Sequence, residues 1–182
     1  MMFRYLGLVL VITSWMGGYY LVRRWYDKDL PTISRHAASN KTASRIFAAI
    51  LIGFGLIFYY WLNRWFVPHL QLSVYFRGLL ACTIVCQILV GLAPDTNGWS
   101  RTIHRWAAYT MAVLYLPLSV LILSSHKLTH LARSIGVVLA VYMLSAFILV
   151  AMAHRAKDKY LFFQASYLIA FQVLILSSSY LS

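Results

Sequence analysis

Residues 134–153 read SIGVVLAVYMLSAFILVAMA, twenty positions without a charged side chain. The hydrocarbon core of a bilayer is crossed by about 20 apolar residues of α-helix. Five other runs of similar length and composition lie along the chain, and charged residues separate them. The sequence therefore predicts an all-α polytopic membrane protein, a bundle of six transmembrane helices over about 3–22, 45–66, 75–93, 105–125, 134–153 and 161–181.

The segments between these runs leave no room for a soluble domain. The longest, roughly 23–45, is too short to bury a hydrophobic core of its own, so residues 1–182 are expected to form one membrane domain. The stretch 65–76 is uncharged but short, and it contains Pro68 and His69, so we interpret it as a loop. Short connections favour antiparallel neighbours, which indicates an up-and-down bundle.

Charge excludes some functions and suggests an orientation. Charged residues make up 11% of the chain, against roughly 25% in a soluble domain, and the formal net charge is +12. No nucleic-acid-binding motif accompanies this charge, so nucleic acid is not an expected partner. Loops 1, 3 and 5 carry eleven basic residues and all four acids, and the opposite side carries Arg4, Arg64, Arg77, Lys127 and Arg133. The positive-inside rule predicts a multi-pass cell-membrane protein with loops 1, 3 and 5 in the cytoplasm and both termini outside.

Chemistry-bearing residues gather on the side of loops 1, 3 and 5. Basic residues there are suited to anionic lipid headgroups: Arg35, Arg101, Arg105, Arg155 and Lys157. His36, Asp95, His104 and His154 have side chains that can bind a metal, and Ser34, Asp95 and His104 are candidates for catalysis.

Each of these residues also has a structural interpretation. Asp95 can cap its loop or pair with Arg101 or Arg105, and His104 can lie at the interface or bond Asp95. Ser34 and Ser39 can cap a short helix or the start of the second span.

The interior of the predicted membrane region holds almost no ionisable groups. Proton-coupled transporters keep such groups near the midplane, so a proton-driven transporter is disfavoured. Gln164 and Gln172 are eight residues apart and lie roughly on one helix face. They are expected to hold the last helix to its neighbours or to touch a headgroup.

The loop residues carry a family resemblance. Leu30-Pro31-x-Ile33-Ser34 follows the first span, and Gly91-Leu92-x-Pro94-Asp95 precedes His104. This pattern resembles a prokaryotic six-helix membrane family catalogued as domain of unknown function 998. It is also similar to the eukaryotic DRAM/Frag/Sfk membrane proteins, which are implicated in autophagy modulation and membrane-lipid organisation.

That resemblance implies that Ser34, Asp95 and His104 matter, but it assigns no activity. This chain departs from the eukaryotic pattern in two ways. First, Arg35 and His36 follow Ile-Ser where those proteins usually have an acid. Second, those proteins present loop 1 to the lumen or exterior, whereas the charge count predicts a cytoplasmic loop 1 here.

Together the sequence favours a non-enzymatic bundle that binds membrane lipids, with anionic headgroups at its basic face and no cofactor. Other membrane proteins are a second class of partner, which would make the chain an accessory subunit of a larger complex. The remaining alternative is a metal-dependent membrane hydrolase acting on lipid-like substrates through Ser34, His36, Asp95, His104 and His154, with zinc as the metal. Haem near a membrane face is the other cofactor left open.

Overall fold

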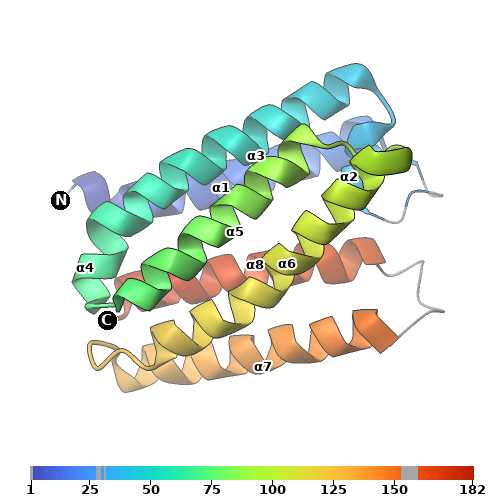
Figure 1. The fold of residues 1–182 in the computed structure, drawn as a ribbon. Helices are drawn as coiled ribbons and strands as arrows, with labels where there is room; N and C mark the ends of the chain where they lie inside the picture. The colour runs from blue at the N-terminus through green and yellow to red at the C-terminus, as the bar shows by residue number, and fades with distance from the viewer. Residues whose placement is uncertain (1, 28–29, 31, 153–159) are drawn as a thin grey trace.

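The computed structural model describes residues 2–27, 30, 32–152 and 160–182, and this part of the chain is an α-helical bundle (Figure 1). Six helices are long and apolar enough to cross a membrane, so the chain is a multi-pass membrane protein. In chain order the elements are α1 (Met2–Arg24), α2 (Ile33–Ala38), α3 (Lys41–Trp61), the π-helical turn η1 (Leu62–Phe66), α4 (Val67–Leu70), α5 (Val74–Leu92), α6 (Gly98–Leu123), α7 (His130–Met152) and α8 (Tyr160–Tyr180).

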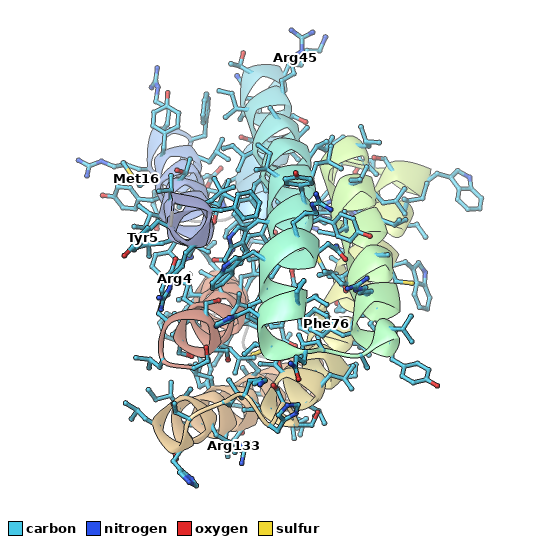
Figure 2. The ribbon with its side chains drawn as sticks, turned by 90° about the vertical axis from the view of Figure 1, so that its left-hand side faces the viewer. Arg4, Tyr5, Met16, Arg45, Phe76 and Arg133 are labelled. Atoms are coloured by element: carbon cyan, nitrogen blue, oxygen red, sulfur yellow. The ribbon has the colours of Figure 1, made fainter. Side chains whose placement is uncertain are left out.

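The long helices pack side by side in the order of the chain, and the last one contacts the first. Helix α3 lies between α1 and α5, α6 lies between α5 and α7, and α8 packs on α7 and returns to α1. Figure 2 looks along the bundle and shows this arrangement, with Tyr5 and Met16 of α1 pointing outward. Both side chains are exposed, whereas Phe76 of α5 is fully buried. Exposed apolar side chains on the outside are the surface expected to face lipid.

The two ends of the bundle differ. Both chain ends lie at one end, and the short helix α2 lies at the other, next to the turn between α5 and α6 (Figure 1). Helix α2 packs on α1, α3 and α8. This end of the bundle is therefore closed by a short helix that also carries polar side chains.

The stretch predicted as a loop at 65–76 is helical as far as Leu70, so that prediction was wrong. Helix α3 continues through η1 into α4 and makes one apolar helix of 30 residues, Lys41–Leu70. In η1 the backbone N–H of Val67 donates to the carbonyl of Leu62, five residues back. Proline has no N–H and its ring collides with the preceding helical turn, and the wider π turn accommodates both properties. Only Gln71, in a left-handed conformation (φ 53°), ends the helix.

Helix α6 also departs from the expected bounds, because it begins at Gly98 and not near residue 105. Asn97 is extended and Gly98 has φ +59°, a conformation that favours glycine. Arg101 and Arg105 therefore belong to the first two turns of the helix. At a spacing of four residues they lie on the same face.

A fully buried tryptophan lies where α3 packs on α1. Trp61 has no exposed surface, and its Nε1 donates to the carbonyl of Phe3 at 3.0 Å. A Cβ added at Gly7 would lie 2.3 Å from a carbon of the Trp61 ring. The missing side chain at Gly7 is what lets the indole fit.

Polar side chains inside the bundle bond to neighbouring helices. The Nε2 atom of Gln87 on α5 donates to the carbonyl of Leu51 on α3 at 2.8 Å. On α8, Gln172 accepts from the indole of Trp15 and donates to the hydroxyl of Ser14, both on α1. The predicted role of Gln172 in holding the last helix is confirmed, and the same neighbour-binding role is seen for Gln87.

Replacing Gln172 with leucine is expected to lower the free energy of unfolding by about 1 kcal/mol, because the Trp15 indole loses its acceptor where water cannot replace it. Thermal unfolding of the detergent-purified protein measures the loss. The matched cycle adds Ser14→Ala, which should cost little once Gln172 is gone. Fully additive losses would show that these groups do not interact.

Candidate functional site

Helix α2 is formed and held by side chains of loop 1 and of α8. The hydroxyl of Thr32 accepts from the backbone N–H of Arg35 at 3.2 Å, a standard N-cap. The backbone N–H of Ile33 donates to Oε1 of Gln164 on α8 at 3.1 Å. The expected role of Gln164 in attaching its helix to a neighbour is thus confirmed. These two bonds position the first turn of α2, which carries Arg35.

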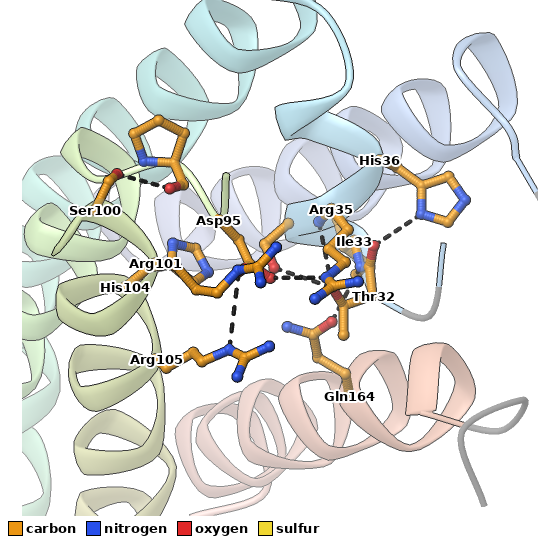
Figure 3. Close-up of polar contacts among 12 residues, drawn as sticks. Thr32, Ile33, Arg35, His36, Asp95, Ser100, Arg101, His104, Arg105 and Gln164 are labelled. Atoms are coloured by element: carbon orange, nitrogen blue, oxygen red, sulfur yellow. Dashed lines mark hydrogen bonds and ion pairs between the residues drawn. The ribbon is translucent and has the colours of Figure 1, made fainter. Parts of the chain in front are cut away.

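The turn between α5 and α6 is fastened by its own hydrogen bonds. Ser100 on α6 donates from its hydroxyl to the carbonyl of Pro94 at 2.7 Å, and the N–H of Thr96 donates to the same carbonyl at 2.8 Å. The turn is therefore a tight structure, and it holds Asp95 close to the first turns of α6 (Figure 3).

Three arginines surround the carboxylate of Asp95 (Figure 3). Nε of Arg35 lies 3.4 Å from Oδ2, and Nε of Arg101 and Arg105 lie 3.4 and 3.9 Å from Oδ1. The Asp95 side chain is 6% exposed, whereas the arginines are 29%, 36% and 51% exposed. With one negative and three positive charges, this arginine cluster (Arg35, Asp95, Arg101, Arg105) carries a net formal charge of +2.

The contacts in the arginine cluster are long. A charged N–H···O⁻ hydrogen bond is usually about 2.7–2.9 Å. Within the described chain, Oδ1 of Asp95 and Nε of Arg101 are buried and have no hydrogen-bond partner. All three arginines approach the carboxylate through Nε. The terminal Nη groups are the donors that a phosphate binds in pairs, so the cluster retains capacity for a second anion.

Histidine 104 does not join this cluster. It is buried, its Nδ1 lies 2.7 Å from the carbonyl of Ala93 and 3.1 Å from that of Val90, and both carbonyls belong to the end of α5. A carbonyl only accepts, so Nδ1 carries the proton. Of the two alternatives predicted for His104, the bond to Asp95 was wrong, since these carbonyls are its partners, and a place at the membrane interface stays a prediction. Because α6 begins early, its second turn brings the imidazole against carbonyls that a helix end leaves unpaired.

Histidine 36 is fully buried, with Nδ1 2.8 Å from the carbonyl of Thr32 and its ring 5.9 Å from that of Tyr26. Its Nε2 has no partner among the described residues. Ser34 is buried with its hydroxyl 3.1 Å from that of Thr32, and Thr32, not Ser34, is the N-cap. Ser39 caps the other end of α2, as the sequence allowed, and Asn40 caps α3.

The structure thus joins some of the candidate residues and separates others. The predicted pairing of Asp95 with Arg101 or Arg105 is confirmed with both, and Arg35 is added from loop 1. Within the described residues no three His, Cys, Asp or Glu side chains come together as a metal would need. His154, Arg155 and Lys157 lie outside the described residues.

Sequence reasoning missed a groove beside the cluster. An open hollow of about 290 Å³ lies on α6 and is lined by Thr102, Arg105, Trp106 and Tyr109. The spacing 102, 105, 106 and 109 follows one helix face and is visible in the sequence. The sequence prediction began this helix near residue 105, so Thr102 was not expected on the same helix as the other three.

No protein-family model, no curated protein and no solved structure matches the chain.

Proposed function

We propose that this integral membrane protein binds an anionic lipid headgroup at the arginine cluster and catalyses no reaction there. The single observation that carries the proposal is the net charge of +2 created by three guanidinium groups around one buried carboxylate. Guanidinium groups bind phosphate oxygens in pairs and with directed geometry. Arg35, Arg101 and Arg105 are the residues we assign to the headgroup.

The position of the cluster in the fold supports a lipid over a soluble anion. Arg101 and Arg105 are on the first two turns of α6, whose apolar length then crosses the membrane region. A group at the end of a spanning helix lies at the depth of lipid phosphates. The exposed indoles of Trp99 and Trp106, on either side of these arginines along the helix, are typical of that interface.

The charge asymmetry of the chain supports an orientation in a cell membrane. We propose that loops 1, 3 and 5 face the cytoplasm and that both termini are outside, because eleven of the sixteen basic residues are on the loop 1, 3 and 5 side. The cytoplasmic leaflet carries the anionic lipids that such a face attracts. We also propose that the chain belongs to the prokaryotic six-helix family whose loop motifs it resembles.

Replacing Arg101 and Arg105 together with glutamine is expected to weaken binding of phosphatidylglycerol by about tenfold or more. The reason is that charge-assisted hydrogen bonds to phosphate are lost while Arg35 still neutralises Asp95. Native mass spectrometry of the detergent-purified protein, titrated with phosphatidylglycerol or with zwitterionic phosphatidylcholine, measures the affinity for each lipid.

The matched control is Arg77→Gln, which removes an exposed positive charge at the opposite end of the bundle. It should leave the preference for phosphatidylglycerol unchanged. A wild-type protein that binds both lipids equally, or an Arg77 variant that loses as much affinity as the double variant, would refute the proposal.

A further inference from the structure

We infer that the ligand of the arginine cluster is a whole glycerophospholipid, whose phosphate is held by the cluster while an acyl chain lies in the neighbouring groove on α6. This inference rests on the proposed function and specifies its ligand. It assigns a binding role to Thr102, Trp106 and Tyr109, which the headgroup proposal does not need.

Arg105 belongs to both parts of the site. Its Nε lies 3.9 Å from the Asp95 carboxylate, and its side chain is also part of the groove wall. The charged centre and the groove are therefore adjacent, without an intervening residue. A lipid has the same arrangement, since its phosphate and the start of its acyl chains are separated only by glycerol.

The other groove residues present apolar surface. Trp106 and Tyr109 are 71% and 58% exposed, so both rings offer most of their surface to lipid directly beside Arg105. The hydroxyl of Thr102 donates to the carbonyl of Gly98 at 3.4 Å, so this polar group is paired within the helix. An acyl chain is the apolar partner that a membrane supplies at this depth.

Charge selects the kind of lipid. A cluster with net charge +2 attracts a phosphate whose charge is not cancelled by a choline or ethanolamine group. Arg105 on the groove wall also disfavours an uncharged hydrocarbon alone. A second copy of the chain would have to bring a negative charge to this position. Basic residues greatly outnumber acidic ones in the chain, so a second copy is a poor match for the cluster.

The experiment combines a photoactivatable lipid with groove variants. Phosphatidylglycerol carrying a diazirine on its acyl chain is incubated with the purified full chain, irradiated, and the crosslinked peptides are identified. Crosslinks are expected within residues 102–109. Trp106→Ala combined with Tyr109→Ala should lower both the crosslinking and the phosphatidylglycerol affinity in native mass spectrometry by about tenfold.

Trp99→Ala is the matched control, because Trp99 is an 83% exposed indole of the same helix that does not line the groove. It should leave both readouts unchanged. Glycerol phosphate and inorganic phosphate, which offer the charge without a chain, should fail to displace the lipid at concentrations where phosphatidylglycerol does.

The outcomes separate this inference from the proposed function. If the Arg101/Arg105 variant loses lipid but the Trp106/Tyr109 variant does not, and crosslinks map elsewhere, the headgroup site stands and the groove assignment is wrong. If phosphate alone competes as well as the lipid, the ligand is a soluble anion and the inference is overturned. If the groove variant alters only the oligomeric state, a second copy of the chain occupies the groove.

Discussion

Replacing Asp95 with asparagine is expected to cost about 2–3 kcal/mol of stability, more than any other single substitution in the arginine cluster. The side chain keeps its shape but loses the negative charge that Arg35, Arg101 and Arg105 share. Breaking a fully buried ion pair costs about 3–5 kcal/mol, and the partial exposure of the three arginines reduces that figure. Thermal unfolding in detergent at low salt measures the loss.

The cost of Asp95→Asn should depend on the arginines that it strands. In the Arg101→Gln and Arg105→Gln background two of the three unbalanced charges are gone, so the same substitution is expected to cost less than half as much. Raising the salt concentration should also reduce the loss for the single variant, because the exposed guanidinium groups become screened. An equal cost in both backgrounds would mean that Asp95 stabilises its turn and not the arginines.

Replacing Gly7 with alanine is expected to destabilise the protein by about 1–3 kcal/mol, although alanine is the better helix former. The new methyl group would overlap the ring of Trp61, which has no exposed surface into which it can move. Displacing the ring would also break its hydrogen bond to the carbonyl of Phe3. Thermal unfolding and near-ultraviolet circular dichroism of the indoles together report both effects.

Gly18→Ala is the control for this substitution. It lies on the same helix, and a Cβ there meets nothing within 4 Å. It should be neutral or slightly stabilising, as expected from helix propensity. In the Gly7→Ala protein, Trp61→Phe removes the overlapping ring and should cost less than it does alone. If Gly7→Ala and Gly18→Ala behave alike, α1 is free to move away from α3.

The membrane helices could be predicted from the sequence because length and lack of charge are local properties. The uncharged run at 134–153 needs no partner to be recognised. The ends of the helices were harder to predict, because charged residues were taken as their boundaries. Arg101 and Arg105 are instead inside α6, where they face an acid, and Pro68 is inside a helix because a π turn precedes it.

The candidate site was only half predictable, for a reason that the residues make plain. Asp95 and the arginines of α6 are within ten residues of one another, so their pairing follows from the chain. Arg35 joins them from sixty residues away, because Thr32 caps α2 and Gln164 anchors it to α8. The partners of His104 were not predicted, since the unpaired carbonyls at the end of α5 become visible only in three dimensions.

The continuous helix from Lys41 to Leu70 is long compared with the membrane that it crosses. Thirty residues at 1.5 Å each extend about 45 Å, which exceeds the hydrocarbon core of about 30 Å and equals a bilayer with its headgroup layers. In a thinner bilayer this helix must tilt or push its ends into water. Both ends are tied to neighbours, so such a tilt would reach α2 and the arginines next to it. The lipid binding that we propose at that end would then depend on the width of the membrane around it.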